Sequence, residues 1–95
     1  MASEIDVRDE PDESRYALYV DGELTGVAEY ALAGDTIAFT HTVISHPDRG
    51  SGLGGRLVEA AVADVRERGG LTVDPQCPFV AHWFEEHPDQ ADLLG

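Results

Sequence analysis

Hydrophobic and polar residues alternate along the first half of the chain, with the period of half-buried β-strands. The segments are separated by turn residues, including Asp21-Gly22, a pair typical of hairpins. The last segment, TIAFTHTVI, is rich in β-branched and aromatic residues and is predicted to be a central strand. The alternation therefore predicts an antiparallel meander of four strands, at residues 5–7 (ended by Pro11), 15–20, 24–33 and 36–44.

The period changes to that of an α-helix after Gly52. Apolar residues recur every three to five positions as far as Arg68, and Gly69-Gly70 then supplies a helix stop signal. The predicted apolar stripe consists of Leu53, Leu57, Val58, Ala61, Val62 and Val65.

The last quarter of the chain predicts one more strand and one more helix. Residues 71–75 form a short β-rich run that ends at a proline. Residues 78–87 have the pattern of a short amphipathic helix, with four side chains expected to face inward: Phe79, Val80, Trp83 and Phe84.

The order of these elements predicts the fold class. A helical crossover joins the strand at 36–44 to the strand at 71–74, so those two strands must be parallel and the crossover right-handed. We expect one α/β domain of the α+β kind over residues 1–95, in which a meander leads into a β-α-β crossover and a short C-terminal helix.

Charge and composition restrict the partners. The chain has 19 acidic residues and six basic ones, all arginine, for a formal net charge of -13. Such a charge repels nucleic acid and anionic membranes, so neither is expected as a partner. The acidic start, MASEIDVRDE, does not resemble a signal peptide, and no apolar run approaches the ~20 residues of a membrane span. A cytoplasmic protein is therefore expected.

A single cysteine, Cys77, excludes an internal disulfide. No cluster of cysteine and histidine at ligand spacing is present, and the four histidines have no matching carboxylates, so no metal site is predicted.

A glycine-rich segment, HPDRGSGLGG at residues 46–55, follows the central strand and opens the long helix. Free backbone amides and the positive end of the helix dipole meet there, which favours binding of an anion such as phosphate. Gly52, Gly54 and Gly55 lack the Cβ atoms that would hold a pyrophosphate away, while Arg49 and Arg56 add positive charge.

Several interpretations compete for this segment. A Walker-type loop needs a lysine, which the chain lacks. GSGLGG matches the dinucleotide pattern G-x-G-x-x-G, but SHPDR separates it from the strand that it should follow directly. A tight strand-to-helix connection without a ligand is a further alternative.

The segment RGSGLG, residues 49–54, resembles the (Q/R)-x-x-G-x-(G/A) loop of the Gcn5-related N-acetyltransferases. Together with FTHTVI and CPFVAHWFEEHPD, it makes residues 15–94 similar to the small, single-domain branch of that family. The resemblance implies a mixed sheet of the family's type and acetyl-coenzyme A as cosubstrate, without a metal. The residues expected to bind the coenzyme are His46, Arg49, Gly50, Ser51, Gly52, Leu53, Gly54, Gly55 and Arg56.

The resemblance also suggests roles near the reacting carbonyl. Backbone amides of Val43 and Ile44 would polarise the thioester carbonyl, and Phe79 would touch the pantetheine arm. The aromatic residues of the last helix are otherwise expected to pack the core rather than to stack on an adenine ring.

Two side chains are candidates for catalysis. Cys77 precedes a helix, which favours the thiolate, and in the family resemblance it would act as nucleophile or as acid; the alternative is an inert buried thiol. If Phe39, His41 and Val43 share one face of the strand, His41 would lie beside the reaction slot as a base; the alternative is a histidine hydrogen-bonded within the sheet.

The function expected from the sequence is an acetyl-coenzyme A-dependent N-acetyltransferase. Longer members of the family have additional helices and strands that shape the acceptor pocket, so the amine acceptor, small molecule or protein, is not identified. The alternatives are a non-catalytic acyl-CoA-binding or sensor module and a nucleotide-binding protein.

Overall fold

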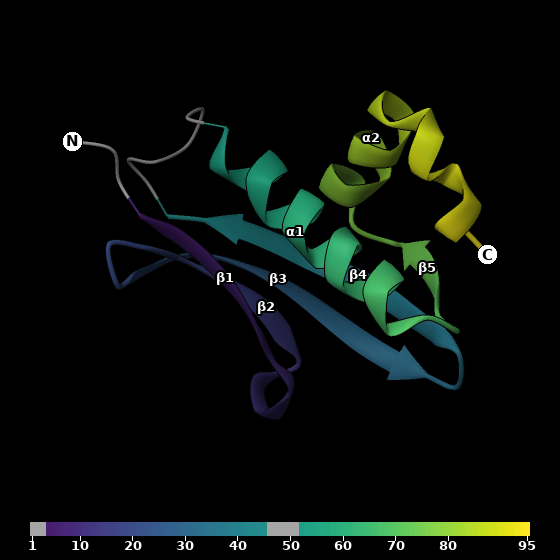
Figure 1. Ribbon diagram of the computed structural model, residues 1–95, viewed down its shortest axis with the longest axis horizontal. Coiled ribbons are helices and arrows are strands. Elements are labelled where there is room, and N and C mark those ends of the chain that lie inside the picture. The colour runs from purple at the N-terminus through teal and green to yellow at the C-terminus, as the bar shows by residue number, and fades with distance from the viewer. Residues whose placement is uncertain (1–3, 46–51) are drawn as a thin grey trace.

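The computed structural model describes residues 4–45 and 52–95. Five strands form a single sheet, and the two α-helices lie along one face of it (Figure 1). The strands are β1 (Ile5–Glu10), β2 (Arg15–Val20), β3 (Glu23–Ala33), β4 (Thr36–Ile44) and β5 (Thr72–Pro75). The helices are α1 (Leu53–Arg68) and α2 (Pro78–Glu86), with short 3-10 helices η1 (Pro11–Glu13) and η2 (Pro88–Leu93).

The strands lie in the sheet in their order along the chain. Neighbouring strands are antiparallel from β1 to β4, and β4 pairs with β5 in parallel. The predicted α+β class, meander, crossover helix and C-terminal helix are thereby confirmed. The hairpin between β2 and β3 has the expected backbone, because Asp21 and Gly22 both have positive φ angles, 51° and 84°.

The hydrophobic core lies between the sheet and α1. Every residue of the predicted apolar stripe of α1 is buried, against Tyr16, Phe39 and other side chains of the sheet. Burying a Leu or Val side chain completely contributes about 1.5–3 kcal/mol, so this stripe fixes the helix on the sheet. No helix among the described residues is long and apolar enough to cross a membrane.

Polar contacts also attach α1 to the sheet. The hydroxyl of Tyr16 donates to Asp64 at 2.6 Å, and that of Tyr30 donates to Asp9 at 2.6 Å. Arg68 forms ion pairs with both carboxylates. Burial, and next the hydrogen bond to Asp64, raises the pKa of Tyr16 well above its usual range.

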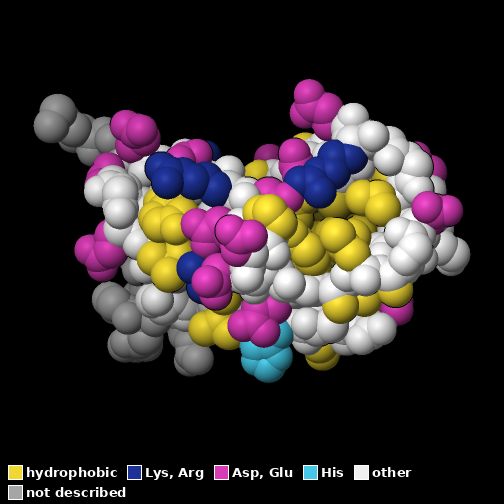
Figure 2. Space-filling model, turned by 90° about the horizontal axis from the view of Figure 1, so that it is seen from below, with side chains coloured by type: hydrophobic (Ala, Val, Ile, Leu, Met, Phe, Trp, Pro, Cys, Tyr) yellow, Lys and Arg dark blue, Asp and Glu magenta, His cyan; other side chains and the backbone are white. Residues whose placement is uncertain are grey.

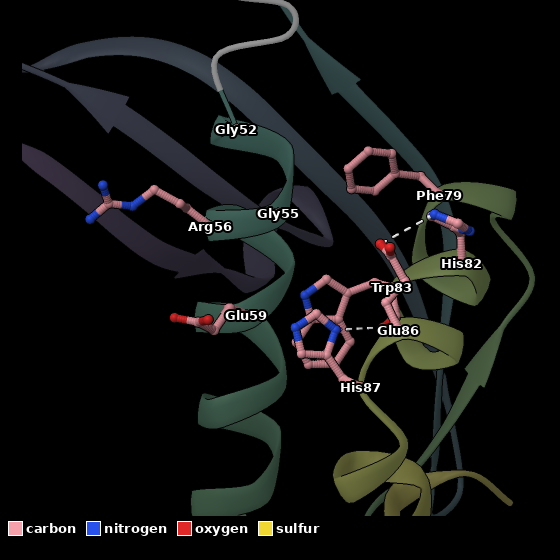
Figure 3. Close-up of a pocket in the computed structure, with 9 residues that line it drawn as sticks. All are labelled: Gly52, Gly55, Arg56, Glu59, Phe79, His82, Trp83, Glu86 and His87. Carbon is pink, nitrogen blue, oxygen red and sulfur yellow. Dashed lines mark hydrogen bonds and ion pairs between the residues drawn. The ribbon is translucent and has the colours of Figure 1, made fainter.

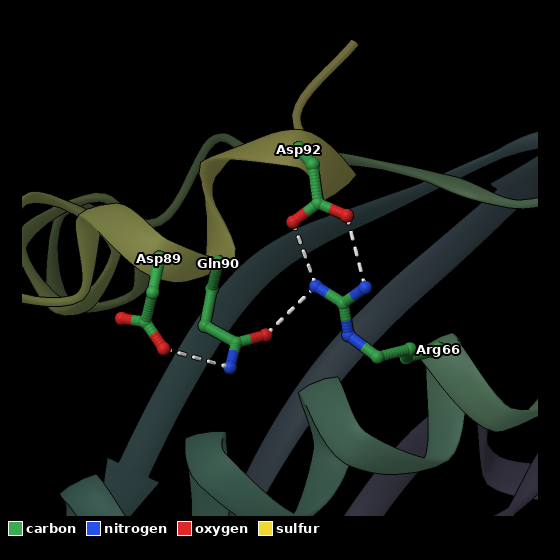
Figure 4. Close-up of polar contacts among 4 residues, drawn as sticks. All are labelled: Arg66, Asp89, Gln90 and Asp92. Carbon is green, nitrogen blue, oxygen red and sulfur yellow. Dashed lines mark hydrogen bonds and ion pairs between the residues drawn. The ribbon is translucent and has the colours of Figure 1, made fainter.

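A second set of contacts attaches η2 to α1 (Figure 4). The guanidinium of Arg66 donates to both carboxylate oxygens of Asp92, at 2.8 and 2.9 Å, and to the amide oxygen of Gln90 at 2.9 Å. These bonds hold the end of the chain beside the last turns of α1.

Acidic side chains are prominent on the surface. Figure 2 shows one face of the molecule, on which magenta acidic groups surround yellow hydrophobic groups and the basic groups are few. The distribution agrees with the net charge of -13.

A β-bulge in β4 changes which side chains share a face. Glu29 pairs with His41 but Tyr30 pairs with Phe39, so Thr40 is an extra residue opposite β3. Phe39 belongs to the core, and Thr42, three residues later, contacts the core residue Cys77. In a regular strand, residues three positions apart lie on opposite faces. Phe39 and Thr42 share a face only because the bulge residue Thr40 lies between them.

His41 and Val43 point to the opposite face of the sheet. His41 is exposed, and Val43 is 47% exposed. Ile44 lies on the helix face, because a Cβ added at Gly26 would sit 2.5 Å from its Cδ1 and 3.7 Å from Leu57 Cδ2. The condition under which His41 would lie beside the reaction slot, that Phe39, His41 and Val43 share one face, is therefore not met, because alternation along a strand does not continue through a bulge.

Candidate active site

The first turn of α1 exposes backbone where the sequence predicted it. Gly52 caps the helix with φ of +83°, and its carbonyl accepts the Arg56 amide at 3.2 Å. The amides of Leu53, Gly54 and Gly55 begin the helix and have no intrahelical acceptor. A Cβ at Gly52 or Gly55 would meet nothing within 4 Å, so a ligand can approach this backbone closely. His46, Arg49, Gly50 and Ser51 lie outside the described residues.

Gly54 has a different reason to lack a side chain. A Cβ there would lie 2.6 Å from Cζ of Phe79, so the missing atom makes room for that ring instead of for a phosphate. Leu53 directs its side chain into the core. Both residues can therefore offer only backbone amides to a ligand.

A groove of about 320 Å³ runs from this helix end along the space between α1 and α2 (Figure 3). Phe79 and Trp83 project from α2 toward α1, whereas the side chains of Arg56 and Glu59 extend from α1 away from α2. The groove is lined by Gly52, Gly55, Arg56, Glu59, Phe79, His82, Trp83, Glu86 and His87. Its volume suits a small-molecule ligand.

The aromatic residues of α2 separate into two groups. Trp83 and Phe84 are buried, which confirms their predicted packing role, although Trp83 also reaches the groove. Phe79 is 44% exposed, so the prediction that it faces inward is wrong: it stands at the edge of the groove, against Gly54.

The far end of the groove carries a stacked pair. The rings of Trp83 and His87 lie 4.1 Å apart with 15° between their planes, and Nδ1 of His87 is 2.7 Å from the Trp83 carbonyl oxygen. His82 and Glu86 pair across one helical turn at 3.2 Å. Neither His82 nor His87 was among the site residues predicted from the sequence.

Cys77 caps the N-terminus of α2 and is only 6% exposed. Its amide donates to the Phe39 carbonyl at 2.8 Å, and its Sγ lies 3.4 Å from the hydroxyl oxygen of Thr42. Burial acts to raise the pKa of the thiol. The hydrogen bond with the Thr42 hydroxyl and those from the amides of Val80, Phe79 and Thr42 act against it, and the net pKa of the thiol is lowered.

The thiol lies beside an unpaired part of β4. Pairing between β4 and β5 ends at Phe39 and Pro75, so among the described strands residues 40–44 of β4 have no partner on that side. The Thr42 amide faces the thiol, whereas the Ser45 amide donates to the Thr25 carbonyl on β3 at 2.8 Å. Alternation between these two residues directs the amide of Ile44 to the open side and that of Val43 toward β3.

Thr42 is the site residue that sequence reasoning missed. The alternating pattern placed it on the face opposite Phe39, and nothing in the sequence marks the bulge that reverses this. Within the described residues no hydrogen bond joins His41 to Cys77, and the bulge puts them on opposite faces. A role for His41 as base stays a prediction.

Taken chemically, the site combines three elements. A thiol with a lowered pKa can act as a nucleophile, the free edge of β4 can donate a hydrogen bond to a carbonyl oxygen, and the start of α1 can bind an anion. Together they suit the transfer of an acyl group from a carrier that has phosphate groups.

Comparison with solved structures finds proteins of the same fold. A GCN5-like protein of Staphylococcus aureus, solved by NMR, superposes with a TM-score of 0.71 at 22% identity, covering 95% of this chain and 87% of that one. The ribosomal-protein-S18-alanine N-acetyltransferase of Escherichia coli superposes with a TM-score of 0.63 at 17% identity, over 77% of this chain and 50% of that one. At these identities the likeness establishes a shared fold.

A search of curated proteins finds no match to this sequence. The sequence profile of the family described as GCN5-related N-acetyl-transferase matches residues 15–93, which is most of the chain. The chain therefore belongs to the GCN5-related N-acetyltransferase family.

Proposed function

We propose that this protein transfers an acetyl group from acetyl-coenzyme A to an amine, through an acetyl thioester on Cys77. Family membership supports acetyl transfer in general. The observation that carries the finer proposal is the placement of Cys77, whose pKa is lowered beside Thr42 and the unpaired part of β4.

The start of α1 fits the diphosphate of the coenzyme. Its amides are approachable at Gly52 and Gly55, and the helix dipole there favours negative charge in an otherwise acidic protein. The groove between α1 and α2 continues from this point and would hold the rest of the coenzyme.

In the first step, the Cys77 thiolate attacks the carbonyl carbon of the acetyl group. The bond from that carbon to the coenzyme sulfur breaks, and the coenzyme leaves as a thiolate that takes a proton from water. The amides of Thr42 and Ile44 lie on the side of β4 from which a developing oxyanion would be stabilised. In the second step, a neutral amine attacks the acetyl carbon and the C–N bond forms. The bond from that carbon to Sγ of Cys77 breaks, and the departing sulfur takes the proton that the nitrogen loses, which restores the thiol.

The proposed place of action is the cytoplasm, since a reducing compartment keeps an unpaired thiol such as that of Cys77 reduced.

The test is incubation with acetyl-coenzyme A labelled in the acetyl group, followed by denaturing electrophoresis and mass spectrometry. We expect label on Cys77, and none in the Cys77→Ser variant. Label that persists in that variant would contradict the nucleophile role. Calorimetric binding of the coenzyme without any label would instead favour a non-catalytic acyl-CoA-binding module.

A further inference from the structure

Four ionisable side chains form one row across the face of the sheet that carries no helix of the described chain. The strand register pairs Glu10 with Arg15, Arg15 with Glu29, and Glu29 with His41. Glu29 lies on this open face because its neighbour Tyr30 points into the core.

The first two members of the row neutralise each other. Nε of Arg15 lies 2.8 Å from Oε1 of Glu10, and this carboxylate also accepts the Tyr19 hydroxyl. Within residues 4–45 and 52–95, the ion pairs do not include Glu29. Glu29 and His41 are therefore two exposed, adjacent groups at the β4 end of the row.

A hollow lined in part by apolar side chains lies next to them. Val27 pairs with Val43 on the adjoining row, and Leu24 and Val43 are exposed apolar side chains. A hollow of about 260 Å³ is lined by Arg15, Leu24, Thr25, Gly26, Val27, Val43 and Ser45. Apolar side chains grouped at a depression beside a carboxylate suit a ligand with an alkyl chain and a cationic end.

The row also ends at the edge of β4 that lies beside the thiol. His41 immediately precedes Thr42, whose hydroxyl and amide contact the thiol from the other face. Among the described strands β4 has no partner on the β5 side over residues 40–44, so no backbone pairing closes the way from this face to the thiol there.

We propose that the acceptor is a primary alkylamine that binds this open face, with its alkyl chain in the hollow and its ammonium group beside Glu29. The net charge of -13 attracts such a cation. This inference rests on the proposed acetyl-Cys77 intermediate.

His41 then has a defined task. The imidazole takes one proton from the ammonium group, and the neutral nitrogen attacks the acetyl carbon. The C–N bond forms, the bond between that carbon and Sγ of Cys77 breaks, and the departing sulfur takes the second proton from nitrogen. Glu29 binds the acceptor, and His41 acts as general base.

The experiment measures the second half of the reaction by itself. Protein labelled on Cys77 is freed of excess acetyl-coenzyme A, and the loss of label is followed with n-butylamine and, separately, with hydroxylamine. Hydroxylamine is largely uncharged near neutral pH and needs neither an ammonium site nor a base. Glu67→Gln, on the exposed side of α1, is the matched charge control.

For n-butylamine, we expect Glu29→Gln to raise the half-saturating concentration about two- to fivefold, which is the range for a solvent-exposed ion pair. His41→Gln is expected to slow the maximal rate about 100-fold. Neither variant should change the hydroxylamine rate or the initial labelling. Normal labelling together with unchanged n-butylamine kinetics in both variants would overturn the acceptor site alone.

A binding measurement tests the proposed acceptor site independently of any catalytic activity. On titration of unlabelled protein with n-butylammonium chloride, the NMR signals of Glu29, His41 and Val43 are expected to shift, while those of α2 do not. n-Butanol, the neutral isostere, should bind more weakly. If Cys77 is never labelled, the proposed function fails; if n-butylammonium gives no shifts at these residues, the acceptor site fails.

Discussion

The thiol of Cys77 lies 3.4 Å from the hydroxyl of Thr42, although 35 positions separate the two residues in the sequence. The contact joins the start of α2 to the unpaired part of β4. It is also one of the hydrogen bonds that lower the pKa of the thiol against the effect of burial.

Removing this hydroxyl should make Cys77 less reactive. Thr42→Val keeps the shape of the side chain but removes the hydrogen bond, so the pKa of Cys77 is expected to rise and less thiolate to exist at pH 7. The pH dependence of alkylation by iodoacetamide measures this directly, and its midpoint should move to higher pH.

Thr36→Val is the control for that experiment, because it removes a threonine hydroxyl at the other end of the same strand, where it contacts Thr72. An equal shift of the midpoint in both variants would show that the effect is not specific to the Thr42 contact.

A substitution at Gly55 tests whether the groove binds the coenzyme, and it leaves the core undisturbed. A side chain at this position enters open space beside the groove, so Gly55→Leu should obstruct the coenzyme. We expect affinity for acetyl-coenzyme A to fall at least about tenfold, a loss of about 1.4 kcal/mol in binding. The free energy of unfolding should stay the same or rise by up to about 1 kcal/mol, because glycine is a poor helix former. Calorimetry and urea unfolding, with Glu67→Leu as control, separate the two effects.

Gly54 and Phe79 should be energetically coupled. In the unmodified protein, a methyl group at Gly54 would collide with the Phe79 ring and displace it. In a Phe79→Ala background that collision is absent, and Gly54→Ala should give the full gain of about 0.8–1 kcal/mol for replacing glycine in a helix. A double-mutant cycle by urea unfolding measures the difference, and additivity within about 0.3–0.5 kcal/mol would contradict the contact.

The raised pKa of the buried Tyr16 predicts that the folded protein loses stability at alkaline pH. The pKa of Tyr16 is raised in the folded protein by burial and by its hydrogen bond to Asp64, relative to about 10 when unfolded. A raised folded-state pKa gives stability that is fully present below the unfolded value and is lost as pH rises beyond it. Urea unfolding at pH 8 and at pH 10.5 should show this loss.

Tyr16→Phe provides the comparison. It should cost about 1 kcal/mol at pH 8, the usual value of one hydrogen bond, and should lose less stability between the two pH values than the unmodified protein does. A loss between the two pH values equal to that of the unmodified protein would mean that Tyr16 does not contribute to the alkaline sensitivity.

The architecture followed from local patterns in the sequence. The change of hydrophobic period after Gly52, the Asp21-Gly22 turn and the Gly69 stop each specify an element or its end from nearby residues alone. The order of elements then required the parallel pair of β4 and β5. The same local patterns predicted that Cys77 lies at the start of α2 and that α1 begins at the glycine-rich segment.

The parts that failed depend on contacts between distant residues. The bulge at Thr40 arises from how β4 pairs with β3, and a single strand's alternation does not record it. For that reason Thr42 was overlooked, and the shared face of Phe39 and His41, on which a place for His41 beside the slot depended, does not exist. The Phe79 ring packs against Gly54 of α1 at the edge of the groove, and the apolar pattern of α2 alone does not predict a contact with another helix.

The supernumerary threonine of β4 makes that strand tolerant of a shorter length at this one point. Phe39 and His41 already pair with consecutive residues of β3, so deleting Thr40 would leave an unbroken ladder in which the imidazole still faces water and the partner of the sulfur still faces the oily interior. Shortening the strand by this residue should therefore be far less harmful than straightening the strand with the residue retained, which would turn every later side chain to the other face.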